Sequence, residues 1–590
     1  MPIENVLFPL VLLLWPLVKI TQGVDVSDTT YSLGNYMFPH GIQPMWIMST
    51  YLSNAIGSVF VRLPGGDTLL GMNIYGGLVM SAIALTAYYS LRNDFTAPVL
   101  FMGEFLAISF CWIPTGIFYN YLTYLFFTVA GILIFKALKK NDDRLLLIAG
   151  LVLGLNLFIR IPNITECALI LAVWFVTFYS HKYETVKVSG EEASNDKPVK
   201  KCVIRTLYCI AGYIVGAAIP FCAIILNYGF KGISDMLAGL NGVTNADDTY
   251  TPLKMFTGIL EAYWRSARWI ALIVLVVGVG TAMFAVFQNK LKWLKKIIYV
   301  GVMALLIRFF WGRGMFSLRY YEDYTAMYEW GMIALFISIA SIIVVLIKAK
   351  DYNRLVYAYA WISLVMILIT PLGSNNTTYQ NLNNLFMVMP FTVYVVGGWM
   401  YRGAHRLRLE GMLHGCNFPW MSMVLVLSLM IFVQSSLFHL NFVFRDGMRG
   451  EERNTQVEGV DSLRGMYTNR ENAKAIDEAA AAVAGASAES AIFWGDCPGL
   501  SFIFRIPSAI NTSWPSLDSY SAKQLKDELS RITGTDEAGK VIIICRKMDD
   551  YSDIKMDKQT IMDDFIKDNA YEAILDNNEY TIYVQEQIDQ

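Results

Sequence analysis

The chain has 590 residues, of which 55% are hydrophobic and 16% charged, with a formal net charge of −2. A soluble domain carries roughly a quarter charged residues, so this composition excludes an ordinary soluble protein. The near-neutral total hides two regions of opposite sign. The first 438 residues carry 31 Lys and Arg against 22 Asp and Glu, whereas residues 439–590 carry 16 against 27. We expect no nucleic-acid partner.

Apolar runs long enough to cross a bilayer recur along the first 438 residues, because about 20 apolar residues span its hydrocarbon core. The first run, "VLFPLVLLLWPLVKI", has no basic segment before it and no small-residue cleavage site after it. We therefore interpret it as a retained helix rather than a signal peptide. Thirteen transmembrane helices are expected, at residues 5–20, 68–90, 95–112, 118–138, 145–159, 162–180, 203–226, 267–288, 296–311, 329–347, 354–371, 385–401 and 418–438.

The positions of Lys and Arg indicate the orientation of these helices. Compact basic clusters face the cytoplasm in membrane proteins. With a cytoplasmic N-terminus, every compact cluster between spans falls on that side, at residues 136–144, 181–202, 289–296, 348–354 and 402–408. An odd number of spans then places residues 439–590 outside. We expect a multi-pass protein of the plasma (cytoplasmic) membrane with an extracytoplasmic C-terminal domain.

Two outer loops are unusually long, at residues 21–67 and 227–267. The first contains "PMWIMSTYLSNAIGSVF", an apolar stretch interrupted by Ser and Asn. Its length and polarity favour a helix that lies along the membrane surface.

Residues 439–590 are predicted to form a soluble α/β domain. Helices are expected at 468–485, at 521–532, where Ser521 and Gln524 form a capping box, and in "KQTIMDDFIKD". The short apolar runs "AIFWG", "KVIIICR" and "YTIYVQ" are typical of buried strands. This alternation favours a small, mostly parallel sheet with helices on its faces.

Two carboxylates follow the first span directly, Asp25 and Asp28 in "QGVDVSDTTYSLGNY". They are either solvated loop charges or partly desolvated groups at the membrane interface. Desolvation raises the pKa of a carboxylate and makes it a better proton acceptor. The aromatic and amide residues that follow, among them Tyr31 and Asn35, favour the second interpretation.

With this motif the chain resembles the GT-C class of membrane glycosyltransferases, such as protein O-mannosyltransferases and lipid A aminoarabinose transferases. These enzymes use sugars linked to polyprenyl phosphate, and share a multi-span bundle, a long first outer loop with a catalytic acidic motif, and often a soluble outer C-terminal domain. The chain departs from their pattern because "VDVSDTTY" has no adjacent acidic pair. The resemblance implies that Asp28 is the catalytic base, with Asp25 as second choice.

The same resemblance implies binding residues for the sugar or acceptor. Tyr31 follows Asp28 at a spacing similar to that of the family. The stretch "WIPTGIFYNYLTYLFF" resembles a region where several members carry an Asp, and here that position corresponds to Asn120 beside Tyr119. Tyr31, Asn35, Tyr119 and Asn120 are therefore the expected contacts of the sugar or acceptor.

The implied reaction is an inverting displacement in which a carboxylate deprotonates the acceptor hydroxyl and polyprenyl phosphate leaves. Arginine suits the departing phosphate because it forms paired, charge-assisted hydrogen bonds. Arginines expected on the outer side in aromatic surroundings are Arg160, Arg265, Arg268, Arg313 and Arg319, with Arg265 and Arg268 at the start of a helix. Each is alternatively an interfacial anchor that reaches into the lipid headgroups.

No cofactor is expected, although a divalent metal stays possible. The five histidines are scattered and no Cys or His spacing resembles a zinc site. The outer acidic residues Asp247, Asp248, Glu322 and Asp323 either hold a metal or acceptor or are solvated. Cys497 and Cys545 are in the outer domain, where a disulfide is permitted.

Three interpretations compete. The expected one is a glycosyltransferase that takes a sugar from a polyprenyl-phosphate-linked donor to a glycan, lipid or protein acceptor. Membrane lipid is its other expected partner. A transporter or flippase for a lipid-linked sugar is the first alternative, but the candidate polar residues cluster outside rather than mid-bilayer. Glu104 lies inside a span, where charge is expensive, and a structural partner such as Arg92 or Arg160 is expected for it. The second alternative is a non-catalytic membrane protein that binds cell-envelope glycan.

Overall fold

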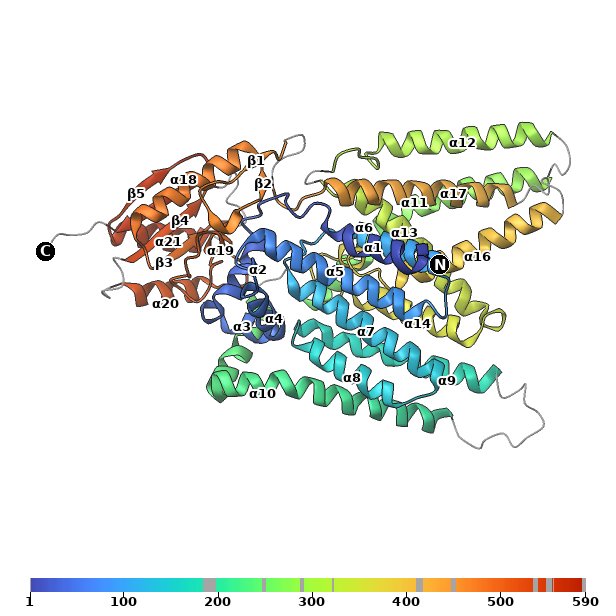
Figure 1. Ribbon diagram of the computed structural model, residues 1–590, viewed down its shortest axis with the longest axis horizontal. Coiled ribbons are helices and arrows are strands. Elements are labelled where there is room, and N and C mark those ends of the chain that lie inside the picture. Colours follow the sequence, from blue (N-terminus) through green and yellow to red (C-terminus); the bar gives the residue numbers. More distant parts are fainter. Residues whose placement is uncertain are drawn as a thin grey trace.

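The structure is a computed structural model that describes residues 2–183, 198–246, 251–286, 291–320, 323–409, 417–446, 452–533, 540–547, 554 and 556–585. Figure 1 shows a long helical bundle at one end of the molecule and an α/β domain at the other. The bundle is made of η1 (Ile3–Leu7), α1 (Phe8–Leu14), η2 (Trp15–Leu17), α5 (Leu69–Leu91), α6 (Ala97–Phe110), α7 (Phe118–Lys140), α8 (Arg144–Leu157), η4 (Ile161–Leu169), α9 (Ile170–Tyr183), α10 (Pro198–Ala246), α11 (Pro252–Val286), α12 (Lys292–Gly312), α13 (Thr325–Ile347), η6 (Ala349–Asp351), α14 (Arg354–Ile369), α15 (Tyr379–Leu382), α16 (Val388–Leu409) and α17 (Phe418–Asn441).

The chain is a polytopic helical membrane protein. Each of the thirteen apolar runs in the sequence overlaps one or more of these helices (Figure 1). Within the described residues, seven helical segments are long and apolar enough to cross a membrane by length and composition: α5, α7, η4 with α9, α10, α11, α13 and α17. The number of helices that cross the membrane and their orientation stay predictions.

Close helix packing in the bundle depends on glycines spaced four residues apart. Gly150 and Gly154 of α8 face Gly212 and Gly216 of α10. A Cβ at Gly154 would lie 2.2 Å from the backbone oxygen of Tyr213, and one at Gly216 would lie 2.1 Å from that of Leu151. Small residues at this spacing let two backbones approach closely, which is a common way to pack helices in membranes.

The second segment expected as an outer loop, residues 227–267, is helical at 227–246 and 252–267, so its description as a loop is wrong there. Helix α10 continues to Ala246 after a kink at Gly229, where φ is 67° and ψ is −179°. Helix α11 begins at Pro252 and runs for 35 residues, about 52 Å at 1.5 Å per residue. That length exceeds the roughly 30 Å hydrocarbon core, so α11 is longer than one crossing requires. Asp247 and Asp248 lie outside the described residues.

The first long outer segment folds into short helices: α2 (Asp28–Met37), η3 (Pro39–Gly41), α3 (Pro44–Ser49) and α4 (Tyr51–Val61). In Figure 1, α2, α3 and α4 lie between the bundle and the α/β domain. The predicted helix is therefore present, divided into α3 and α4 at Thr50. Tyr36 joins this segment to the bundle, because its hydroxyl donates to the backbone oxygen of Gly116 and accepts from the backbone N–H of Phe118.

The C-terminal α/β domain, called the outer domain after its expected side of the membrane, contains a four-stranded sheet with the strand order β3 (Ser490–Trp494), β4 (Val541–Arg546), β6 (Tyr580–Gln585) and β5 (Tyr571–Asp576). Strands β3 and β4 are parallel, but β4–β6 and β6–β5 are antiparallel, so the expectation of a mostly parallel sheet is wrong. Its other elements are β1 (Thr455–Gln456), η8 (Asp461–Leu463), β2 (Tyr467–Thr468), α18 (Arg470–Ala486), α19 (Leu500–Phe504), α20 (Ala522–Ile532) and α21 (Met556–Asp568).

Local sequence signals account for these helices. The predicted capping box is present at α20, where the Ser521 side chain accepts from Gln524 and the Gln524 side chain accepts in return. Helix α18 begins with an Asn469 cap and covers one face of the sheet, while α20 and α21 pack on the other. The core beneath α18 is continuous with the core of the bundle.

The first outer segment and the outer domain are joined by backbone hydrogen bonds. Gly23 donates to the carbonyl of Tyr467 at 2.8 Å, and Gly499 donates to that of Val26 at 2.8 Å. A Cβ at Gly499 would lie 1.7 Å from Oγ1 of Thr30, so only glycine fits there. The outer domain is therefore docked on the loop that carries Asp25 and Asp28.

Candidate functional site

Asp25 precedes α2 and is nearly buried, at 5% exposure. Its Oδ1 accepts hydrogen bonds from the backbone N–H and hydroxyl of Ser27, at 2.8 and 2.6 Å. Its Oδ2 accepts from the backbone N–H and hydroxyl of Thr29, at 2.8 and 2.7 Å. Two of these four bonds come from backbone N–H groups at the start of the helix, where backbone donors lack intrahelical partners, and the other two come from hydroxyls. Asp25 therefore acts as a cap of α2.

Asp28 is the first residue of α2 and its side chain is 35% exposed. Its Oδ2 lies 3.5 Å from Nη1 of Arg445, which follows α17. The same Nη1 lies 3.1 Å from Oδ2 of Asp496, which follows β3, and donates to Oγ of Ser27 at 3.1 Å. One guanidinium thus lies between a carboxylate of the first outer segment and a carboxylate of the outer domain.

The surroundings of Asp28 raise its pKa to about 7. Desolvation by the surrounding protein is the largest cause, and the negative charges of Asp25 and Asp496 act in the same direction, while Arg445 opposes them. A carboxyl group with a pKa near neutrality is suited to general acid–base catalysis, because it both accepts and releases a proton at working pH.

About one helical turn after Asp28, Tyr31 of α2 contacts an aromatic side chain of the outer domain. The ring of Tyr31 meets that of Trp514 edge-on, with centroids 5.3 Å apart. The Tyr31 phenol also interacts with the side chains of Asn35 and Thr512. The segment "NTSWPSLDSY" of the outer domain therefore covers α2 beside Asp28. The structure brings Asp25, Asp28, Tyr31 and Asn35 together on one short helix and the turn before it.

Tyr119 and Asn120 lie in the first turn of α7. Tyr119 lies near enough to Tyr31 that ionisation of its phenol would disfavour ionisation of the Tyr31 phenol. Arg160 lies over the Tyr119 ring at 6.0 Å and donates to the backbone oxygen of Gly373 at 2.9 Å. Asn120 is 3% exposed, and among the described residues its Oδ1 has no hydrogen-bond partner.

The other predicted arginines contact different groups. Arg265 pairs with Glu261 at 2.5 Å, and Arg268 lies 3.5 Å from Glu329 and over the ring of Trp269. Both are in the interior of α11, so their placement at a helix start is wrong; the helix begins at Pro252 because the apolar sequence before them is itself helical. Arg313 lies over the ring of Phe309, and Arg319 is exposed.

Sequence reasoning missed Arg445 and Asp496. Arg445 follows the last apolar run, in "NFVFRDGM", and resembles the other outer arginines with aromatic neighbours. Asp496 lies in "GDCPG", the connection between β3 and α19. What the sequence lacks is any local signal that these two residues meet Asp28 across more than 400 positions.

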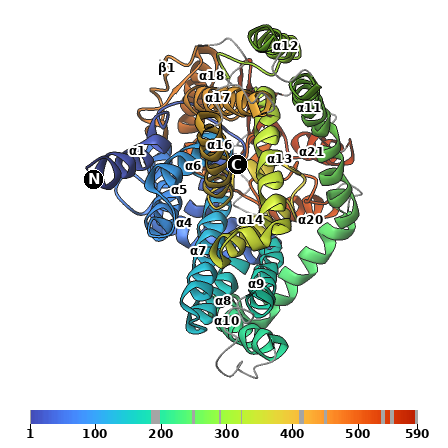
Figure 2. The ribbon, with the colours of Figure 1, turned by 90° about the vertical axis from the view of Figure 1, so that its right-hand side faces the viewer.

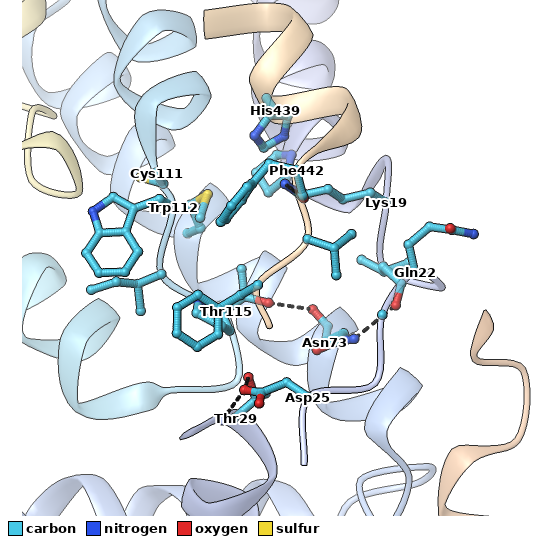
Figure 3. A pocket seen from close by; sticks show the side chains of 18 of the residues that line it. Lys19, Gln22, Asp25, Thr29, Asn73, Cys111, Trp112, Thr115, His439 and Phe442 are labelled. Carbon is cyan, nitrogen blue, oxygen red and sulfur yellow. Dashed lines mark hydrogen bonds between the residues drawn. The ribbon is translucent and has the colours of Figure 1, made fainter. Parts of the chain in front are cut away.

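A cavity of about 100 Å³ extends from Asp25 toward the membrane part. Figure 3 shows Asp25 and Thr29 at one end and Lys19 and His439 at the other. Its walls come from the turn after η2, the start of α5, residues 111–115 and the segment that follows α17. The cavity therefore links the candidate catalytic loop to the ends of the apolar helices.

The described residues contain no group of three or more His, Cys, Asp or Glu side chains arranged to hold a metal ion. Glu322 is not among the described residues. Cys497 and Cys545 are free thiols in the structure. Glu104 is fully buried, and neither oxygen has a hydrogen-bond partner among the described residues, so the expected pairing with Arg92 or Arg160 is absent. Arg92 instead lies 3.3 Å from Oδ1 of Asn5.

Comparison of the chain with protein-family models and with curated protein sequences gave no match.

Proposed function

We propose that the protein is an integral membrane glycosyltransferase that moves a sugar from a polyprenyl-phosphate-linked donor to a glycan, lipid or protein acceptor on the outer face of the membrane. The observation that carries the proposal is the position of Asp28. Its carboxylate has a pKa of about 7 and lies where the helical bundle meets the outer domain. A lipid-linked sugar and a water-soluble acceptor meet at such a boundary.

The reaction needs one proton acceptor and one leaving group. Asp28 takes the proton of the acceptor hydroxyl as that oxygen attacks the anomeric carbon of the donor sugar. The bond between that carbon and the phosphate oxygen breaks, and polyprenyl phosphate leaves with the bonding electrons. The acceptor oxygen and the sugar are then joined with inverted configuration, and negative charge has moved from the base to the phosphate.

The hydrogen bonds of Asp25 support Asp28 as the base. Each oxygen of Asp25 already accepts two hydrogen bonds from Ser27 or Thr29, so the carboxylate is held in place and its oxygens are engaged within the turn. The Asp28 side chain is instead 35% exposed, and it forms an ion pair with Arg445. Tyr31, Asn35 and Trp514 beside it supply the mixture of ring faces and amides that binds sugars.

The orientation proposed with this function follows the basic clusters of the sequence. The N-terminus is cytoplasmic, the outer domain is extracytoplasmic, and the membrane is the plasma membrane. The donor is then used on the face where the outer domain and α2 meet.

A second candidate, a transporter for a lipid-linked sugar, has one observation in its favour. Glu104 of α6 is completely buried without a hydrogen-bond partner among the described residues. An ionisable group inside a membrane bundle is expensive and commonly belongs to a transport or proton path. This candidate predicts that Glu104→Gln abolishes function while Asp28→Asn does not.

Sugar transfer by the purified protein in liposomes tests the proposal. Radiolabelled polyprenyl-phosphate sugars are offered with membrane extract as acceptor. We expect Asp28→Asn to lower the rate about 100-fold or more, the scale of a lost general base. The matched control is Asp67→Asn, since Asp67 is an exposed carboxylate of the same outer segment that pairs with Arg505 at 2.7 Å. Transfer that survives in Asp28→Asn, or label that crosses the bilayer without being consumed, contradicts the proposal.

A further inference from the structure

Lys19 is the charged group at the end of the cavity opposite Asp25, beside the apolar helices (Figure 3). Its ammonium donates to the backbone oxygen of Phe442 at 2.5 Å and lies 5.5 Å from the centre of that ring and 5.7 Å from that of Phe438. Among the described residues no carboxylate forms an ion pair with it. Lys19 is only partly exposed. A partly buried cation without a counter-ion is costly, so an anionic occupant of the cavity would stabilise it.

His439 supplies an independent observation at the same end of the cavity. It is 3% exposed and its Nε2 lies 2.8 Å from the backbone oxygen of Trp15. Since a carbonyl only accepts, Nε2 carries the proton and Nδ1 is left free in the neutral ring. Nδ1 is buried and has no hydrogen-bond partner among the described residues. A buried polar atom in this state indicates a missing partner.

The remaining walls fit a small polar group attached to an apolar chain. Gln22, Asn73 and Thr115 line the middle of the cavity, with Asn73 donating to the backbone oxygen of Ile20 at 3.0 Å. Pro16 and Met80 supply apolar wall from the helices. The volume of about 100 Å³ exceeds the roughly 10–15 Å³ that one water requires. The cavity therefore has room for a polyatomic anion.

We propose that this cavity binds a phosphate group, with Lys19 as its charged ligand and His439 Nδ1 as a second polar contact. The His439 ring accepts a hydrogen bond from a protonated phosphate oxygen, or takes up a proton and donates to an ionised one. This inference rests on the proposed function for the identity of the lipid that carries the phosphate. It replaces the arginines first expected at the phosphate site, which are Arg160, Arg265, Arg268, Arg313 and Arg319.

The position of the site also orients a bound donor. With the phosphate at Lys19, the opposite end of the cavity is lined by Asp25 and Thr29, which belong to the turn where α2 and Asp28 begin. A sugar attached to the phosphate then points to the loop that carries the base, and the lipid points to the helices.

Equilibrium binding to the full-length protein in nanodiscs tests the site without requiring transfer. The probes are a radiolabelled polyprenyl phosphate, the matching polyprenol and inorganic phosphate. We expect Lys19→Met to weaken binding of polyprenyl phosphate at least about tenfold, as for loss of a charge-assisted hydrogen bond, and Lys19→Arg to restore most of it. Lys474→Met is the matched control, since Lys474 is 76% exposed on α18 and pairs only loosely with Glu478 at 3.7 Å.

Comparison of the three probes shows whether the bound phosphate belongs to a lipid or is free. Binding of the lipid phosphate that inorganic phosphate does not displace identifies a lipid headgroup site, whereas Lys19-dependent binding of inorganic phosphate alone identifies a site for free phosphate. Equal binding of polyprenyl phosphate by Lys19→Met and the wild type, or equal binding of the polyprenol, overturns the inference.

The outcomes also separate this inference from the proposed function. Asp28→Asn is expected to bind polyprenyl phosphate normally while losing transfer. Normal binding by Lys19→Met, with transfer still dependent on Asp28, refutes the phosphate site alone. Lys19-dependent binding without transfer from any donor refutes the glycosyltransferase alone.

Discussion

Arg445 and Asp496 shift the pKa of Asp28 in opposite directions, so replacing them should shift it in opposite directions as well. Arg445→Gln removes the positive charge that lowers this pKa, so the midpoint of the pH–rate profile moves upward from about 7. Asp496→Asn removes a negative charge that raises the pKa, so the midpoint moves downward. In both cases activity rises with pH, because the base acts when it is deprotonated.

The distance between the charges sets the size of the first effect. Arg445 Nη1 lies 3.5 Å from Asp28 Oδ2, and the two side chains are 45% and 35% exposed. This exposure calls for the screened limit of the Coulomb energy, which is about 1.2 kcal/mol at 3.5 Å in water. Since one pH unit corresponds to about 1.4 kcal/mol, Arg445→Gln is expected to move the midpoint up by about 0.9 pH unit.

Initial rates of transfer measured at saturating donor across neutral pH provide the assay. Arg505→Gln is the control, because Arg505 is a similarly exposed arginine at the same boundary that pairs with Asp67 instead. Its profile should match that of the wild type. The reasoning is refuted if Arg445→Gln and Asp496→Asn move the midpoint in the same direction, or if neither moves it.

Four further predictions concern stability and topology. Because the pKa of Asp28 is raised from 3.8 to about 7 on folding, its ionisation opposes folding progressively from about pH 4 to pH 7; Asp28→Asn should therefore raise the apparent melting temperature at pH 8 and change it little near pH 4. Asp25→Ala removes the four bonds that cap α2 and should destabilise the first outer segment by about 1–2 kcal/mol, seen as faster proteolysis there. Gly499→Ala places a Cβ 1.7 Å from Thr30 Oγ1 and should loosen the outer domain in the same proteolysis assay, whereas Gly485→Ala, with open space around it, should not. Alkaline phosphatase fused after residue 446 should be active and fused after residue 296 inactive; the reverse pattern would contradict the expected orientation.

Sequence patterns predict the local structure of this chain well. The apolar runs predict the helices because a helix makes its backbone hydrogen bonds within its own segment. It can therefore form in an apolar environment whatever lies next to it. The capping box at Ser521 and Gln524 is equally local. The hairpin of β5 and β6 was missed although its signal is present: two short runs flank "NNE" at 577–579, a loop length and composition typical of antiparallel strands.

Long-range contacts explain why the candidate site was predicted only in part. Asp25, Asp28, Tyr31 and Asn35 are neighbours in sequence and the motif identified them together. Arg445 and Asp496 reach Asp28 because the outer domain docks on α2, and this docking depends on shape, such as the absence of a side chain at Gly499. Lys19 was assigned to the end of a span, where its relation to His439 cannot be read from a pattern.

The pairing of the first outer segment with the outer domain has a consequence for biogenesis. The backbone groups of Thr21 and Gly23 form hydrogen bonds with Tyr467, a residue synthesised about 440 positions later. At roughly 5–20 residues per second, the ribosome needs about 20–90 seconds to supply that partner. Throughout this time the backbone groups of Thr21 and Gly23 that bond to Tyr467 lack this partner, so the segment after the first helix cannot reach its final structure until residue 467 has been made. A nonsense mutation late in the gene would leave every transmembrane helix intact and still prevent the loop at the N-terminal end from maturing.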